Sequence, residues 1–263
     1  MQDLPIVLYT DHYVNRALCH NFALGSKSLM CHVNNFSDFS KTIATYGFLR
    51  GTGEALQKAK KFYYIDHGYF KQSSRNFEKN KTKINDLNGY FRIVYNNYWH
   101  NSLGNKSKDR FERMGIEIKN IRKTGEYIVL SEPSIDDIYF FKLNNWVKET
   151  KNKLKKITDR KVIIHNRSSK IPLNELLKNA WAFVSNHSTA GFLAMIEGVP
   201  AYFTNPTLCN VSNLDDIEKN EINYSAFYNL AYEQWTVEEI RSGEAWNYLC
   251  NKNNIKINKN NFH

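Results

Sequence analysis

The sequence has no pair of cysteines at the spacing of a metal-binding or redox motif. Its four cysteines, Cys19, Cys31, Cys209 and Cys250, lie far apart in the chain. Zinc ribbons and thiol–disulfide motifs place two cysteines a few residues from each other. We therefore expect four reduced thiols, which is the usual state in a cytoplasmic protein.

Long apolar runs are also missing. No stretch approaches the roughly 20 apolar residues that a membrane-spanning helix needs. The opening residues, MQDLPIVLYTDHYV, lack the basic segment with which a signal peptide begins. The sequence therefore predicts a cytoplasmic protein without stable membrane insertion.

Motifs for metals and for mononucleotides are scarce as well. The sequence contains no HExxH motif, no convincing pair of metal-binding aspartates and no cluster of His and Cys. The segment GTG at 51–53 is too short to be a P-loop or a dinucleotide-binding fingerprint. We expect a reaction that requires no metal ion.

Positive charge, in contrast, is abundant in the first half of the chain. The sequence has 36 Lys and Arg against 26 Asp and Glu. Residues 1–124 contain 20 of the basic and 10 of the acidic side chains, which leaves 16 of each for residues 125–263. A basic half is typical of a protein that binds a polyanion, such as nucleic acid, a phosphorylated glycan or an anionic membrane. AT-rich codons also favour Lys, although such a bias should affect both halves.

Apolar runs and amphipathic segments alternate along the chain. In the first half, strands are expected at 4–9, 29–36 and 61–66, with helices near 17–24 and 51–61. The second half repeats the pattern, with strands at 126–134, 161–167, 181–188 and 199–206 and helices at 138–158, 173–180 and 189–198. Near the end, Thr236 and Glu239 have the spacing of a helix-capping box.

This alternation predicts parallel sheets with crossover helices. We therefore expect an α/β protein with two Rossmann-like lobes, residues 1–124 and 125–263, and a ligand cleft between them.

The turn between the strand at 181–188 and the next helix is a candidate phosphate site. Small polar residues lead into a helix that begins near Ala190. The start of a helix offers unpaired backbone N–H groups and the positive end of its dipole, which suit a diphosphate. Ser188 and Thr189 add hydroxyl groups, and His187 lies beside them. An ordinary helix cap would show the same pattern.

Several motifs resemble known glycosyltransferases. SNHSTAGFLAMIEGVPAYF, from residue 185, resembles the donor-site turn and helix of GT-B glycosyltransferases, especially those of the capsule and lipopolysaccharide type. NLAYEQWTVEEIRSGEAWNYL, together with YYIDHGYF and GYFRIVYNNYW, resembles a family of small phage-encoded proteins taken to be glycosyltransferases. These motifs lie between about residues 47 and 250. The resemblance implies a GT-B-like fold and a nucleotide-sugar donor, with a UDP-sugar as the first choice.

The resemblance also implies where the donor binds. The second lobe would hold the donor through residues at its strand ends and on the helix: Arg167, Lys170, His187, Ser188, Thr189, Ala190 and Glu197. Many relatives have a glutamate in this helix that holds the donor ribose. The matching position here is Leu193, and Glu197 follows one turn later.

The first lobe would then bind the acceptor and supply the base. Transfer with inversion needs a group that removes the proton of the acceptor hydroxyl. Asp66, at a strand end, is the first choice, His67 the second, and Asp11 or His12 the third. Asp66 also fits a residue that merely forms a turn. Arginines among aromatic and glycine residues, together with a neighbouring tyrosine, are candidates for acceptor contact: Arg50, Arg92 and Tyr69.

Three functions remain open from the sequence. The favoured one is transfer of a sugar to a hydroxylated base in phage DNA, by direct displacement without a metal ion, because the motifs resemble phage-encoded proteins and the first half of the chain is basic. A phage-encoded protein would then lie in the host cytoplasm. The second is the same chemistry on a surface glycan or a lipid-linked sugar. The third is a non-catalytic module that binds nucleic acid.

Overall fold

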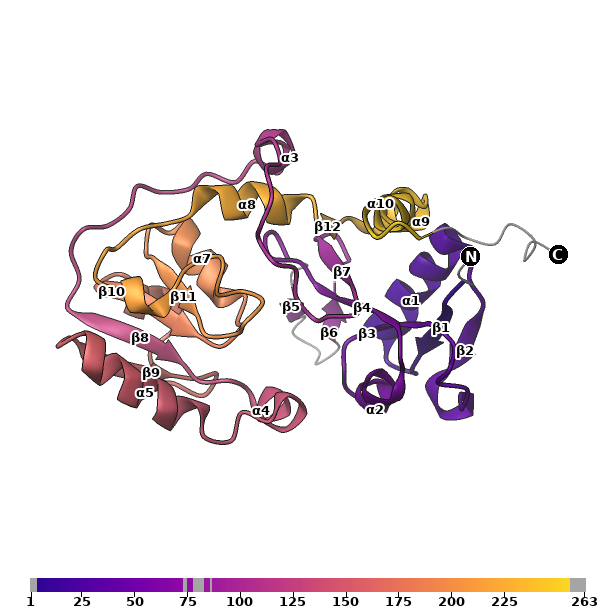
Figure 1. Ribbon diagram of the computed structural model, residues 1–263, viewed down its shortest axis with the longest axis horizontal. Coiled ribbons are helices and arrows are strands. Elements are labelled where there is room, and N and C mark those ends of the chain that lie inside the picture. Colours follow the sequence, from indigo (N-terminus) through magenta and orange to yellow (C-terminus); the bar gives the residue numbers. More distant parts are fainter. Residues whose placement is uncertain (1–3, 73–74, 78–82, 86, 256–263) are drawn as a thin grey trace. The chain divides into compact units, whose positions relative to one another are not determined.

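The chain folds into two α/β units (Figure 1). The computed structural model describes residues 4–72, 75–77, 83–85 and 87–255. Unit 1 comprises Met1–Tyr98 together with Glu233–His263, and unit 2 comprises Trp99–Tyr232. These bounds differ from the expected lobes 1–124 and 125–263: residues 99–124 belong to unit 2, and the C-terminal helices belong to unit 1.

Unit 1 is built on a six-stranded sheet in which four neighbouring strands are parallel. The strand order is β12 (Gln234–Trp235), β7 (Phe91–Tyr95), β4 (Phe62–His67), β3 (Ile43–Tyr46), β1 (Ile6–Tyr9) and β2 (Met30–His32). β7 runs antiparallel to β4, and β12 runs antiparallel to β7. A separate antiparallel pair consists of β5 (Arg75–Phe77) and β6 (Lys83–Asn85).

Both faces of this sheet are apolar and carry helices. Val7 belongs to the cluster formed with the first helix and the last two, whereas Leu8 packs with the second helix. This alternation is expected for a strand buried on both sides. Gly25 lies where the first helix meets the carbonyl of Ile240, and an added Cβ would come within 1.9 Å of that oxygen. The helices are α1 (Tyr13–Ser26), α2 (Thr52–Lys58), α9 (Val237–Arg241) and α10 (Glu244–Lys252).

Unit 2 contains a four-stranded sheet in which every pairing is parallel. The order is β11 (Ala201–Phe203), β10 (Ala180–Ser185), β8 (Tyr127–Ser131) and β9 (Lys161–His165). One face packs on α5 (Trp146–Ile157) through Trp146 and Leu154. α7 (Ala190–Ile196) packs against β10 and β11, and its Phe192 contacts Phe227 of α8 (Tyr224–Ala231). The remaining helices are α3 (Asp109–Arg113), α4 (Ile135–Phe141) and α6 (Leu173–Leu177).

The expected α/β class with parallel-rich sheets is therefore confirmed. The capping box of Thr236 and Glu239 is confirmed as well, at the start of α9. The helix expected over 138–158 is wrong, because it consists of two helices, α4 and α5. Lys142 ends α4 in the left-handed conformation, with φ of 57°, and an αL residue stops a helix. None of the described helices is long and apolar enough to span a bilayer.

The division into units redistributes the charge. Unit 1 carries 17 basic and 11 acidic side chains, and unit 2 carries 19 and 15. The basic excess of residues 1–124 is thus shared between both units, since residues 99–124 bring their lysines and arginines to unit 2. Neither unit alone carries the excess positive charge of the chain.

Gln234 of β12 ties the C-terminal segment to the loop after β4. Its buried Oε1 accepts hydrogen bonds from the backbone N–H groups of Tyr69 and Phe70, at 2.7 and 3.0 Å. Its Nε2 donates to the carbonyl of Phe70 at 3.2 Å. A leucine here would leave these backbone groups buried without this partner, and each such group costs about 1–3 kcal/mol.

We predict that Gln234→Leu lowers the free energy of unfolding by about 3 kcal/mol or more, measured by urea denaturation. The exposed Gln57 of α2 provides the control, and Gln57→Leu should change stability by less than about 0.5 kcal/mol. Equal effects of the two substitutions would show that the Gln234 bonds do not hold the segment in place.

Candidate functional site

The polar side chains of unit 2 gather where its parallel strands end. β8 and β9 end in register at Ser131 and His165, and β10 ends at Ser185. The carboxyl edge of a parallel sheet is where α/β folds bind ligands. The turns that follow these strands hold most of the residues expected to bind the donor.

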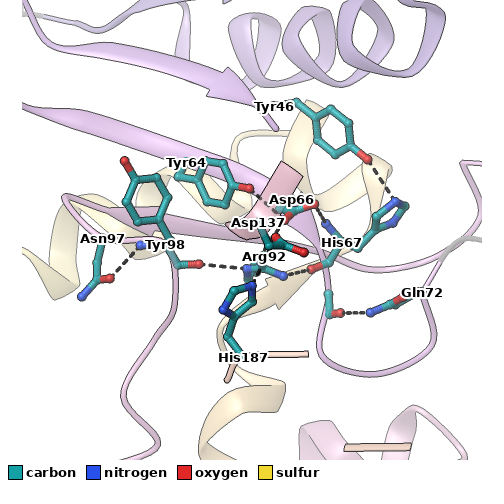
Figure 2. A network of polar contacts seen from close by, with 11 residues as sticks. Tyr46, Tyr64, Asp66, His67, Gln72, Arg92, Asn97, Tyr98, Asp137 and His187 are labelled. Carbon is teal, nitrogen blue, oxygen red and sulfur yellow. Dashed lines mark hydrogen bonds and ion pairs between the residues drawn. The ribbon is translucent and has the colours of Figure 1, made fainter. Parts of the chain in front are cut away.

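His187, directly after β10, lies in a hydrogen-bonded network. Its Nε2 lies 3.2 Å from Oδ1 of Asp137 (Figure 2). Its Nδ1 lies 2.6 Å from Oδ1 of Asn186. The ring packs against both Trp99 and Phe141, with centroid distances of 4.4 and 5.0 Å. His187 is only 11% exposed, so it fixes the turn in place instead of presenting a free nitrogen.

Asp137 links this turn to the start of α4. It forms a capping box with Ser134, and its other carboxylate contact is His187. Burial alone would raise the pKa of Asp137, but hydrogen bonds from His187 and Ser134 outweigh burial and hold the pKa below its ordinary value. The sequence gave no sign of the bond between Asp137 and His187.

The residues after His187 begin α7. Ser188, Thr189 and Ala190 are half-buried at the start of α7. The hydroxyl of Ser188 accepts a hydrogen bond from the N–H of Ala190 at 3.3 Å, and Thr189 makes no side-chain cap bond. Close packing accounts for a glycine at position 191, because an added Cβ would lie 2.7 Å from the ring of Phe203.

The turn after β9 presents the two basic residues expected to contact the donor. Arg167 and Lys170 are exposed. Asn166 shapes this turn: its Oδ1 accepts from the backbone and hydroxyl of Ser168, and its Nδ2 donates to Glu132 at 2.9 Å. Asn166 and Glu132 were missed from the sequence, since an Asn in a turn carries no distinctive signal.

Glu197 is separated from these residues. It follows the last residue of α7, whereas Ala190 is the first, and it pairs with Lys119. Seven residues of helix separate the two ends by about 10 Å. The structure thus places Glu197 at the opposite end of α7 from the other expected donor contacts.

In unit 1, Asp66 is held in an ion pair with Arg92 (Figure 2). Oδ2 of Asp66 accepts from Nη2 of Arg92 at 2.8 Å and from the hydroxyl of Tyr64 at 2.9 Å. Oδ1 accepts from the backbone N–H of His67 at 2.8 Å. Both carboxylate oxygens of Asp66, the first-choice base, therefore already accept hydrogen bonds within unit 1.

Arg92 and Tyr69, two of the expected acceptor contacts, are buried in unit 1, with exposures of 4% and 0%. The guanidinium also donates to the carbonyls of His67 and Tyr98, at 2.5 and 3.1 Å. It stands over the ring of Tyr69 at 5.7 Å. This is a correction to the expectation from sequence, because both side chains stabilise the interior and neither faces solvent.

His67, the second-choice base, is half-buried beside Tyr46. Its Nε2 lies 3.1 Å from the Tyr46 hydroxyl, and its ring stacks on Phe91 at 5.9 Å. Arg50 lies on the exposed loop after β3, with a φ of 60°.

Asp11 and His32 form a second pair at the carboxyl edge of unit 1. They follow and end the neighbouring strands β1 and β2, and Nε2 of His32 lies 3.5 Å from Oδ2 of Asp11. Nδ1 of His32 accepts from the backbone N–H of Asn34 at 3.3 Å, so the proton of a neutral ring is placed on Nε2, facing the carboxylate. The side chain of Asp11 is 90% exposed.

Asn15 holds this edge together. Its Oδ1 accepts from the N–H of Thr10 at 2.7 Å, and its Nδ2 donates to the carbonyl of Tyr46 at 2.6 Å. The ends of β1 and β3 are thereby fixed to α1. Asn15 and His32 were not identified from the sequence. Among the described residues, no group of three His, Cys, Asp or Glu is placed to hold a metal ion.

We predict that Arg92→Met lowers the free energy of unfolding by about 3–5 kcal/mol, because it leaves the Asp66 carboxylate without its buried partner. Urea denaturation measures the change. Arg16 of α1 is exposed, and Arg16→Met should alter stability by less than about 0.5 kcal/mol. A small loss with Arg92→Met would mean that the ion pair is dispensable.

A second prediction concerns pH. The pKa of Asp137 is lowered in the folded chain from its ordinary value of 3.8. A depressed carboxyl pKa contributes stability that is complete above the unfolded value and is lost as pH falls through the folded value. Asp137→Asn should therefore be less stable than wild type by about 1.5 kcal/mol above about pH 5, and this gap should narrow below about pH 4.

Urea denaturation across this pH range tests the prediction, with the exposed neighbour Asp136→Asn as control. The Asp136→Asn control should be only slightly less stable than wild type, and this difference in stability should not change with pH. A gap for Asp137→Asn that stays constant down to pH 3 would contradict the lowered pKa.

Comparisons with known proteins give a weak likeness. No protein-family model and no curated protein matches the sequence. Among solved structures, "Thermosulfurimonas dismutans KpsC, beta Kdo 2,4 transferase" has a TM-score of 0.48 at 8% identity, covering 88% of this chain and 91% of that one. "Thermosulfurimonas dismutans KpsC, beta Kdo 2,7 transferase" has a TM-score of 0.48 at 11% identity, covering 93% and 99%.

Proposed function

We propose that this chain is a glycosyltransferase that takes a sugar from a nucleotide donor at the carboxyl edge of unit 2. The observation that carries the proposal is the pair of parallel-rich sheets with chemically different edges. The edge of unit 2 presents hydroxyls and exposed basic side chains, whereas the edge of unit 1 presents an exposed carboxylate beside an imidazole. The sequence motifs that resemble GT-B glycosyltransferases support the same function.

The donor diphosphate would bind at the turns after β9 and β10. Arg167 and Lys170 are exposed there, and Arg can hold a phosphate through two hydrogen bonds. The hydroxyls of Ser188 and Thr189 add neutral donors. Basic groups at this position stabilise the negative charge that develops on the leaving diphosphate. A UDP-sugar remains the first choice of donor.

Asp11 is the base that the geometry favours, although it ranked below Asp66 and His67 on sequence. Its carboxylate is 90% exposed, whereas Asp66 is 24% exposed and accepts three hydrogen bonds. In the proposed step, the acceptor oxygen attacks the anomeric carbon and gives its proton to Asp11. The bond between that carbon and the diphosphate oxygen breaks, and the nucleoside diphosphate leaves.

The acceptor that we propose is a hydroxyl of a glycan or of a lipid-linked sugar. The basic charge of residues 1–124 and the resemblance to phage-encoded proteins favoured a DNA acceptor, but the two units share the basic excess, with 17 basic against 11 acidic side chains in unit 1 and 19 against 15 in unit 2. Duplex DNA therefore serves as an alternative acceptor in the assay.

The test is a transfer assay with the full chain. UDP-sugars and an activated Kdo donor, the sugar named for the two similar structures, are incubated with oligosaccharide, lipid-linked sugar or hydroxymethylated duplex DNA. Sugar found on a glycan or lipid-linked acceptor supports the proposal. Transfer to DNA alone would overturn the acceptor, and tight DNA binding without donor binding would favour the non-catalytic module.

We predict that Asp11→Asn lowers the rate of transfer by about 10²–10⁴-fold, because the base is removed. Donor binding, measured by calorimetry, should be unchanged, since Asp11 lies in unit 1. Asp38→Asn, also exposed in unit 1, should keep the wild-type rate. A folded Asp66→Asn variant that loses transfer while Asp11→Asn retains it would return the role to Asp66.

A further inference from the structure

Helix α5 carries a concentration of positive charge. Its 12 residues, WVKETKNKLKKI, include five lysines and one glutamate. Unit 2 as a whole has 19 basic and 15 acidic side chains, so the excess on α5 equals that of the unit. The rest of unit 2 therefore has equal numbers of basic and acidic side chains, and the excess positive charge of the unit corresponds to that of α5.

The lysines of α5 face away from the sheet. Trp146, Thr150 and Leu154 form the buried face, whereas Lys148, Lys155 and Lys156 are exposed. Among the residues that the structure describes, Lys153 is the lysine of this helix with a carboxylate partner, Asp215 at 2.8 Å. The helix is thus anchored by its apolar side and presents a basic surface.

The preceding helix, α4, exposes apolar side chains. None of its residues is buried. Ile135 is 77% exposed and Tyr139 is 87% exposed, and their spacing of four residues places them on one side of the helix. Large apolar side chains this exposed contribute nothing to the core of unit 2.

Only four residues separate the end of α4 from the start of α5, and Figure 1 shows the two helices following each other along unit 2. The acidic side chains of the two helices are Asp136 and Asp137 on α4 and Glu149 on α5. Asp136 and Glu149 are exposed, whereas Asp137 is bonded to His187. With these included, lysines still outnumber carboxylates. Basic side chains next to exposed aromatic and aliphatic ones are typical of helices that lie in a membrane interface.

We propose that α4 and α5 form a surface that docks unit 2 onto an anionic lipid bilayer. The lysines of α5 attract the lipid headgroups, and Ile135 and Tyr139 enter the interfacial layer. Nucleic acid phosphates fit the charge, but they offer no partner for exposed Ile135. The proposal rests on the surface of unit 2 alone and holds whether or not the chain transfers a sugar.

The experiment is co-sedimentation of the full chain with vesicles. Vesicles of phosphatidylcholine with about one third phosphatidylglycerol should bind the protein, and pure phosphatidylcholine should bind it far more weakly. Added salt should reduce the binding, because it screens the lysines. Equal binding to both vesicles, or none to either, overturns the proposal.

A lysine-to-glutamine set locates the surface. The triple variant Lys148→Gln, Lys155→Gln, Lys156→Gln should bind anionic vesicles about 100-fold more weakly, at about 1 kcal/mol for each lysine. The matched control changes three exposed lysines elsewhere on unit 2, Lys108, Lys178 and Lys219, to Gln. Similar losses in both triple variants would show that only net charge matters and would overturn the assignment to α5.

The contribution of the exposed apolar side chains of α4 is tested separately. Ile135→Ser with Tyr139→Ser should weaken vesicle binding at least tenfold while leaving the thermal unfolding temperature unchanged, because both side chains are exposed. Duplex DNA is assayed with the same variants. Binding to DNA that depends on the α5 lysines, without vesicle binding, would make the surface a nucleic-acid site and overturn the proposal.

Discussion

Parallel pairing of strands is the constraint on which the functional surfaces of this protein depend. In unit 2 the register brings Ser131 beside His165 and Ser185 beside Phe203. In unit 1 it brings Tyr9 beside His32. Because parallel strands end at the same edge, turns far apart in the sequence become neighbours in space. Each unit therefore gathers its polar turns at one edge without help from the other.

Buried polar contacts then fix these edges. Arg92 joins Asp66, His67 and Tyr98, and His187 joins Asp137 and Asn186. Side chains that are hydrogen-bonded on several sides have few atoms left for a ligand, whereas exposed neighbours remain accessible to one. This distinction explains why Asp11 and Arg167 are better candidates for contact with substrate than Asp66 and His187.

The fold class could be predicted from the sequence, because the class depends on local patterns of apolar and polar residues. Runs such as 161–167 and 181–188 are apolar enough to predict parallel strands, and Thr236 with Glu239 predicts a helix start. The bounds of the units depend on long-range pairing. β12 belongs with β7 because Gln234 and Trp235 pair with Arg92 and Phe91, and no local pattern near residue 234 shows this.

The same limit applies to the candidate site. Asp66 has the sequence context of a catalytic carboxylate, a strand end before a glycine, and only its contact with Arg92, 26 residues away, reveals its structural role. His32 was missed because its partner Asp11 lies across a strand pair. Roles that come from a distant partner cannot be predicted from the sequence, whereas the exposure of turn residues such as Arg167 and Lys170 can.

The most direct test of the central claim is hydrogen exchange of the full chain with and without a nucleotide-sugar that it binds. The proposed function predicts slower exchange in the turns at 131–134, 165–170 and 186–190 of unit 2, with the sheet of unit 1 unchanged. Protection confined to unit 1, or saturable donor binding that leaves these three turns unprotected, would contradict a donor site at the carboxyl edge of unit 2.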